Sequence, residues 1–139
     1  MTKLYDAFCS FCASIVAPLA NLAARIYMGY SIFFVSGLAK LDDFEGTIEL
    51  FEEDWVIPLI PAEPAAYLAT AGELVLPVLL ILGLFTRMGA LGLLVMTIVI
   101  QTFAIQDPQH YIWMLVLGLL LGYGGNKISL DHLLFRRKV

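Results

Sequence analysis

The chain has 139 residues, of which 60% are hydrophobic, well above the roughly 45–50% of a soluble domain, and its mean hydropathy is +0.87. This composition indicates a membrane protein, and the length leaves no room for a separate soluble domain. The net charge of −4 comes from one acidic stretch, and the sequence has no basic face with interleaved aromatic side chains. We therefore expect no nucleic-acid partner.

The charged residues are sorted by region. Eight of the twelve acidic residues lie between the first two apolar runs, in residues 40–64. Within this loop, residues 49–53 combine acidic and apolar side chains at helical spacing, which predicts a solvated amphipathic segment or, alternatively, a metal-collecting surface. Lys and Arg bias their loops toward the cytoplasm, so we predict cytoplasmic termini and an outer acidic loop. The basic residues behind this prediction are Lys3, Arg87, Lys127, Arg136, Arg137 and Lys138.

The segment at residues 5–17 is apolar with scattered polar side chains. It is predicted to be an interfacial helix or an extension of the first span. Cys9 and Cys12 within it have the C-x-x-C spacing of a dithiol redox pair. The predicted cytoplasmic location disfavours a disulfide, so two small apolar residues of an interfacial helix are the alternative interpretation.

Four apolar runs are predicted to cross the membrane, at residues 19–39, 65–85, 88–105 and 111–123. The first three approach the 20 residues that a bilayer core of about 30 Å requires, and the fourth is short but bounded by interface aromatics. The turn after the second run is tight, so the second and third spans should be antiparallel neighbours. We predict an all-α fold, a polytopic membrane four-helix bundle that forms one domain over residues 1–139.

Small residues and a cap indicate how the helices pack and end. Gly89 and Gly92, like Gly118 and Gly122, supply small faces for close helix contact. Ser129 is predicted to cap a last amphipathic turn.

Arg25 and Glu73 are the only charged residues inside the predicted spans. A charge near the membrane centre costs about 2.5–3.5 kcal/mol on insertion scales, so each should face the interior and find a partner. From the helical rise, Glu73 lies about 18 Å and Arg25 about 9 Å from the inner end, which makes direct pairing marginal. Two interpretations stay open: a buried pair or network that fixes helix register, and a ligand or proton site.

The same depth count places other polar side chains near Glu73. We expect a pocket that opens outward, with Glu73 at its floor, and a few polar groups in an apolar wall are typical of small-ligand sites. A quinone headgroup is the ligand considered. No catalytic triad is assembled, and the two histidines lie on opposite faces, so no catalytic or metal site is predicted. The predicted ligand-binding residues are Glu73, Gln101, Tyr30, Arg25, Lys40, His110 and Trp113.

Four sequence elements, in their order and spacing, resemble the DoxX family of membrane proteins. The resemblance covers the chain from about Leu19 to Leu134, and Ser36 stands where many relatives have His. The elements are SGLAKL at residues 36–41, EL at 73–74, LGLFTR at 82–87 and GGNKISLD at 124–131.

The resemblance implies an accessory role more than catalysis. The family name comes from a subunit associated with quinone-linked thiosulfate oxidation, which implies a multi-pass protein of the bacterial inner membrane that serves an oxidoreductase. Residues 55–61 resemble a subgroup that accompanies small metal-stress peptides, which leaves open a metal-stress protein or small transporter using the acidic loop. A structural anchor for a partner protein, and a homo-oligomer in the lipid bilayer, are further alternatives.

Overall fold

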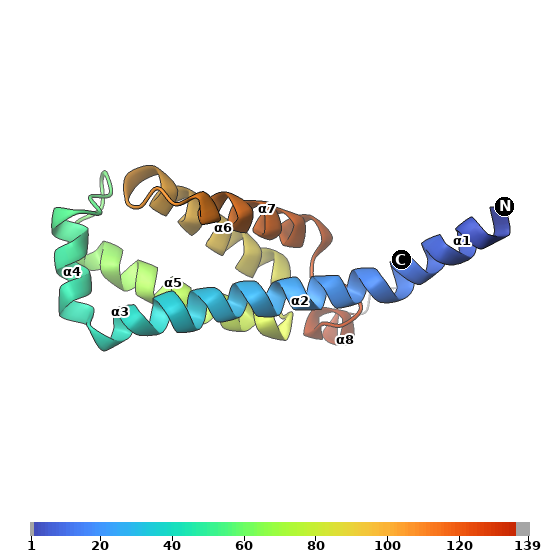
Figure 1. Ribbon diagram of the computed structural model, residues 1–139. Coiled ribbons are helices and arrows are strands. Elements are labelled where there is room, and N and C mark those ends of the chain that lie inside the picture. Colours follow the sequence, from blue (N-terminus) through green and yellow to red (C-terminus); the bar gives the residue numbers. More distant parts are fainter. Residues whose placement is uncertain (1, 136–139) are drawn as a thin grey trace.

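The computed structural model describes residues 2–135, and these residues are helical with no strand. Figure 1 shows long helices lying side by side, α4 across one end of them and α8 at the other. The all-α prediction is therefore confirmed. The elements are α1 (Thr2–Phe11), η1 (Cys12–Val16), α2 (Ala17–Tyr30), η2 (Ser31–Gly37), α3 (Leu38–Asp42), α4 (Phe44–Glu53), α5 (Ala62–Leu82), α6 (Thr86–Phe103), α7 (Pro108–Tyr123) and α8 (Leu130–Leu134).

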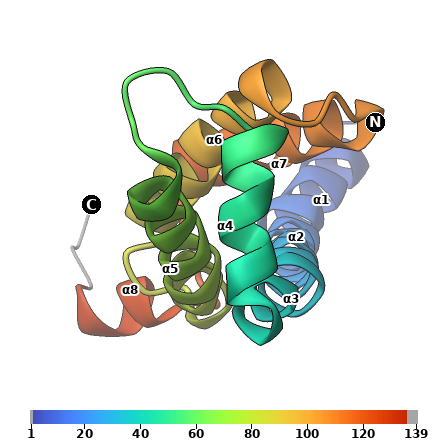
Figure 2. The same cartoon turned by 90° about the vertical axis from the view of Figure 1, so that its left-hand side faces the viewer.

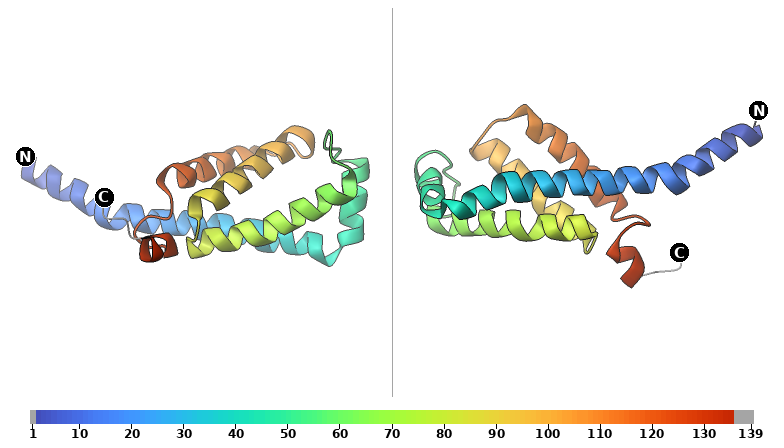
Figure 3. Two further views of the ribbon diagram at one scale, coloured as in Figure 1. Left: turned by 180° about the vertical axis from the view of Figure 1, so that it is seen from behind. Right: turned by 60° about the horizontal axis from the view of Figure 1, so that its bottom comes forward.

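The first five elements form one continuous helix, Lys3–Asp42, of 40 residues. At 1.5 Å per residue it is about 60 Å long, twice the thickness of a bilayer core. Figures 1 and 3 show its N-terminal part projecting beyond the other helices. Residues 5–17 are therefore an extension of the first apolar run, and a separate interfacial helix is not formed.

Two π-helical stretches, η1 and η2, interrupt this long helix. In η1 the Ala17 N–H donates to the Cys12 carbonyl, five residues back. Pro18 follows and has no N–H to offer the carbonyl of Ser14, so a wider turn is a local solution. In η2 the Leu38 N–H donates to the Phe33 carbonyl in the same way, without a proline nearby.

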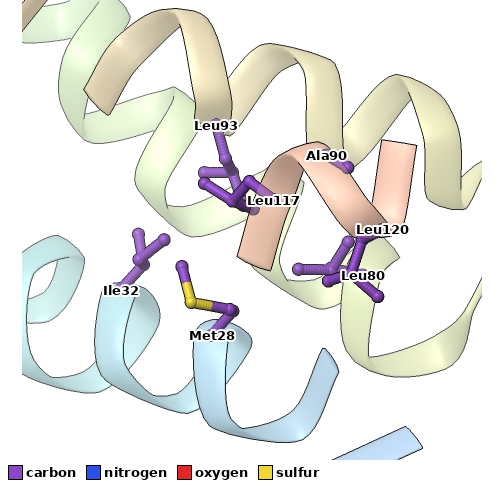
Figure 4. Close-up of a cluster of buried hydrophobic side chains, with 7 residues drawn as sticks. All are labelled: Met28, Ile32, Leu80, Ala90, Leu93, Leu117 and Leu120. Carbon is purple, nitrogen blue, oxygen red and sulfur yellow. The ribbon is translucent and has the colours of Figure 1, made fainter. Parts of the chain in front are cut away.

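Three helices are long and apolar enough to cross a membrane: Lys3–Asp42, α5 and α6. α7 has 16 residues, or about 24 Å. α5 contacts α2, η2 and α6, while α6 packs along α7, and α7 returns to α2. Figure 4 shows one apolar core to which the long first helix, α5, α6 and α7 all contribute. The core residues are Met28, Ile32, Leu80, Ala90, Leu93, Leu117 and Leu120.

Glycines allow two close helix contacts. A Cβ at Gly89 would lie 3.4 Å from the Leu76 carbonyl oxygen, and one at Gly92 would overlap the Leu76 side chain, so the predicted contact of this pair is confirmed. Gly118 and Gly122 meet nothing within 4 Å in the described chain. Gly37 was not foreseen: a Cβ there would lie 3.0 Å from the carbonyl oxygen of Glu73.

The acidic segment contains a helix, α4, that lies across the ends of α3 and α5 (Figure 2). The Asp43 side chain caps it by accepting from the Gly46 N–H at 3.1 Å. Its apolar face packs on α5, where Phe51, Ala65 and Ala66 form a second small core. The predicted amphipathic segment is confirmed, and it is anchored by burial of one face.

The short α8 begins as predicted. The Ser129 hydroxyl oxygen accepts from the His132 N–H at 3.2 Å. The basic residues at 136–138 lie outside the described residues.

Candidate functional site

Glu73 forms an ion pair with Lys40, the one ion pair in residues 2–135. Lys40 Nζ lies 2.7 Å from Glu73 Oε2, and the two side chains are 11% and 4% exposed. Lys40 Nζ also donates to Ser36 Oγ at 2.7 Å. Glu73 therefore pairs with Lys40 and not with Arg25, for which direct pairing was expected to be marginal.

The second π turn brings these groups together. η2 ends at Gly37, where the absence of a side chain lets the first helix approach the α5 backbone at Glu73. Ser36 and Lys40 flank this contact, one helical turn apart. Trp55, which follows α4, places its ring 5.7 Å from Lys40 Nζ and covers the ammonium.

A cavity of about 220 Å³ opens beside the ion pair. Four of the seven residues expected around the ligand, Glu73, Lys40, His110 and Trp113, line it, and both tryptophans of the chain are in its wall. Trp113 Nε1 is buried and has no acceptor among the described residues. An indole N–H of this kind is expected to find a partner, so a residue of the cavity wall carries an unused hydrogen-bond donor. Its apolar wall includes Ile32, Val35, Leu93, Met96, Ile100 and Ile105.

Gln101 fixes the hydrogen-bonding role of His110. The Asp107 N–H donates to Gln101 Oε1 at 3.1 Å, which orients the amide with its oxygen toward the turn. The same oxygen lies 2.7 Å from His110 Nδ1 and can only accept, so Nδ1 carries a proton. In the neutral imidazole, Nε2 is then the acceptor that His110 offers to the cavity. Gln101 thus supports the pocket through His110.

Two predicted pocket residues lie elsewhere. Tyr30 is 58% exposed and its ring contacts Phe34 at 5.0 Å, away from the cavity lining. Arg25 is buried at 1% exposure near the other end of the molecule. Neither side chain lines the cavity. Arg25 lies at another level of the bundle, and Tyr30 faces outward, because depth along a helix leaves the face of a side chain undetermined.

Arg25 ties three parts of the chain together. Its Nε donates to Asn21 Oδ1 at 3.1 Å, and its Nη1 lies 3.5 Å from the carbonyl oxygens of Leu80 and Ile81 at the end of α5. Its Nη2 donates to the carbonyl of Ile128, before α8. Arg25 therefore takes part in a hydrogen-bonded network whose acceptors are three backbone carbonyls and the Asn21 side chain.

Asp131 strengthens the same junction. Its carboxylate accepts from the Phe85 N–H at 2.7 Å and the Thr86 N–H at 2.9 Å, at the start of α6. A carboxylate at a helix N-terminus is favourable. Asn21 Nδ2 also donates to the Gly124 carbonyl at 2.9 Å. Residues 82–87 and 124–131 thus meet at this junction, whose key residues Asn21 and Asp131 the sequence pattern did not single out.

The candidate redox pair lies on the projecting part of the first helix. Both thiols are free, with Cys9 exposed and Cys12 partly buried. Neither approaches the cavity at Glu73.

A second hollow adjoins the cavity on the acidic side. Lys40, Trp55, Val35 and Ser36 line both spaces, and the outer one also contains acidic side chains of α4. Within the described residues no group of three His, Cys, Asp or Glu side chains is placed to hold a metal ion. The acidic side chains are Asp43, Glu49, Glu53 and Asp54.

Comparison with known proteins gives two matches. Residues 20–106 match the family model described as DoxX. An uncharacterized protein of Haemophilus influenzae is 31% identical over 126 residues, which cover 81% of this chain and 82% of the relative. No solved structure matches the chain.

Proposed function

We propose that this chain, which belongs to the DoxX family, is a multi-pass inner-membrane accessory subunit of a redox system and binds quinone in the Glu73 cavity. Its four apolar helices form a membrane bundle with cytoplasmic termini, and α4 covers the outer end. The observation that carries the proposal is Trp113 Nε1, a buried donor without an acceptor among the described residues, on a tryptophan in the wall of a mainly apolar cavity. A quinone carbonyl is a neutral acceptor that fits such a donor.

The polar groups of the cavity suit the two redox forms of a quinone ring. Trp113 offers an N–H to a carbonyl oxygen. In the neutral imidazole that donates from Nδ1 to Gln101, Nε2 of His110 is an acceptor for a hydroxyl group of the reduced form. Lys40 and Glu73 neutralise each other beside the ring, so a neutral ligand meets no uncompensated charge.

The volume suits a headgroup alone. At about 220 Å³ the cavity is smaller than the roughly 300–1,000 Å³ that hold drug-sized ligands. A single ring fits, and an isoprenoid tail lies outside it, along the apolar helix surfaces. This arrangement supports a lipid-soluble ligand over a water-soluble one.

Quinone binding is expected to quench the intrinsic fluorescence, because both tryptophans line the cavity. Titration of the purified protein with decylubiquinone should give saturable quenching. In Trp113→Phe the remaining Trp55 still reports, and affinity should fall up to about tenfold, as for the loss of one hydrogen bond. Leu119→Phe, at a half-exposed position of the same helix, is the control. Equal affinities of Trp113→Phe and the parent protein would exclude the proposed donor.

Gln101 is expected to set the preference between redox forms. In Gln101→Leu, His110 is free to adopt either tautomer, so the affinity for decylubiquinol should fall several-fold under anaerobic conditions while that for decylubiquinone stays unchanged. Leu119→Phe, the control described above, should retain the parent ratio of the two affinities. If Gln101→Leu has the same ratio of decylubiquinol to decylubiquinone affinity as the parent protein, His110 does not accept a hydrogen bond from the hydroxyl group of the quinol.

A further inference from the structure

A third hollow, with different chemistry, lies at the end of the molecule opposite α4, where α6 begins, α7 ends and α8 follows (Figure 1). Its volume is about 700 Å³. Three basic side chains line it, those of Arg87, Lys127 and His132. Each belongs to a different segment, so the fold gathers them.

The cations of this hollow are not neutralised by the described part of the chain. Arg87 and Lys127 form no ion pair there, since Lys40 and Glu73 form the one pair present. Asp131 is the one carboxylate in the lining, and its two oxygens already accept from the N–H groups of Phe85 and Thr86. The hollow therefore presents a surplus of positive charge.

The Arg87 side chain is fixed by contacts with the end of α7, and these contacts leave some of its N–H groups without an acceptor among the described residues. Its Nη2 donates to the Gly122 carbonyl at 3.2 Å. Its side chain lies against Gly124, where a Cβ would be 3.3 Å from the Arg87 Nε. This contact fixes the guanidinium and leaves other N–H groups of the fork for an anion.

The rim of the hollow is apolar and aromatic. Phe85, Met88, Tyr123 and Phe135 line it and are 53%, 65%, 75% and 55% exposed. The rings of Phe85 and Phe135 are 5.7 Å apart and form one wall. Exposed apolar side chains next to unpaired cations, at the end of apolar helices, match an amphiphile with an anionic head.

We propose that this hollow binds the phosphate of an anionic phospholipid, with Arg87 and Lys127 on the phosphate and the acyl chains along Met88 and Tyr123. Basic pockets between helices at the cytoplasmic surface are suited to such headgroups, and Arg recognises phosphate through its planar fork. The site is independent of the Glu73 cavity, from which it is separated by the length of the helices.

The test measures lipid binding to the full chain by native mass spectrometry after detergent extraction. Phosphatidylglycerol should be retained at least tenfold more tightly than phosphatidylcholine. In Arg87→Gln/Lys127→Gln this preference should fall at least tenfold, whereas Arg87→Lys/Lys127→Arg, which keeps both charges, should retain most of it. Lys127→Gln alone removes a side chain that makes no hydrogen bond within the described chain, and should give part of the loss without unfolding.

Three outcomes would overturn the proposal. The first is an unchanged preference for phosphatidylglycerol in the double glutamine variant. The second is an equal loss in Lys3→Gln, which removes a charge from the projecting helix. The third is displacement of the lipid by glycerol 3-phosphate at similar concentration, which would assign the hollow to a free phosphate compound.

Discussion

Replacing Lys40 by methionine will destabilise the protein more than replacing Lys40 and Glu73 together. The single change leaves the carboxylate of Glu73, 3% exposed, without its cation. Removing one partner of a buried pair costs about 3–5 kcal/mol, because an uncompensated charge stays buried. In Lys40→Met/Glu73→Leu no buried charge is left, so most of this loss should be recovered.

The measurement is a double-mutant cycle on thermal unfolding in detergent. The coupling between the two substitutions should be at least 1 kcal/mol, above the few tenths seen for independent sites. Lys3→Met is the matched control, because it makes the same chemical change on the projecting helix and should leave unfolding within about 0.5 kcal/mol of the parent protein. Additive effects of the two substitutions would contradict a stabilising pair.

A further variant, Glu73→Gln, separates a structural pair from a ligand site. If Glu73 serves only to hold Lys40, Glu73→Gln will lower thermal stability and leave quinone quenching unchanged. If the pair also lines a quinone site, Glu73→Gln will abolish ligand retention, because the ammonium of Lys40 then faces the cavity without its counter-charge. The two results are distinguishable in one preparation.

Hydropathy and helical periodicity predict the helices better than they predict contacts. The apolar runs at 19–39, 65–85 and 88–105 lie within or close to the long helices Lys3–Asp42, α5 and α6. The fourth run was placed at 111–123, but α7 begins at Pro108, where the Asp107 side chain accepts from the Gln109 N–H at 2.8 Å. Caps of this kind add polar residues to a helix, and a hydropathy count omits them.

Glu73 has a buried polar partner, as a charge inside the membrane requires, and that partner is Lys40, one of the residues expected around it. Depth measured at 1.5 Å per residue assumes a regular α-helix, and the π turn η2 changes the direction of every side chain that follows it. The long side chain of Lys40 reaches Glu73 from beyond this π turn. Tyr30 lies at a suitable depth and on the wrong face. Nothing in the local sequence marks η2, so this error could not be avoided from residues alone.

The contacts around Arg25 could not be predicted from the sequence, for a different reason. The partners of Arg25 are mostly backbone carbonyls, which every residue has, so no pattern of side chains indicates them. Asp131 acts in the same way through backbone N–H groups. The turn at 82–87 and the segment at 124–131 are far apart in the chain, and only the fold reveals that they form one unit.

Substitution of Arg25 should therefore have the largest effect at the end of the molecule opposite α4. Arg25→Met removes the donor to the Ile128 carbonyl and to Asn21 and takes away the cation that acts on Asp131. Each buried acceptor left without a donor costs about 1–3 kcal/mol, so the loss should reach about 3 kcal/mol even after the relief of burying one charge less. Thermal unfolding in detergent measures this loss.

Arg25→Lys decides whether the charge or the fork of donors matters. A lysine ammonium keeps the charge but concentrates its three donors at one point, whereas Arg25 reaches Asn21, the end of α5 and Ile128 from separate nitrogens. We expect Arg25→Lys to be nearly as destabilised as Arg25→Met, and trypsin to cleave after Lys127 faster in both because the 124–131 segment is released from α2 and α5. If Arg25→Lys unfolds at the same temperature as the parent protein and is cleaved by trypsin at the same rate, one buried positive charge is sufficient. The hydrogen bonds to α5 and Ile128 would then contribute little to holding the helix ends together.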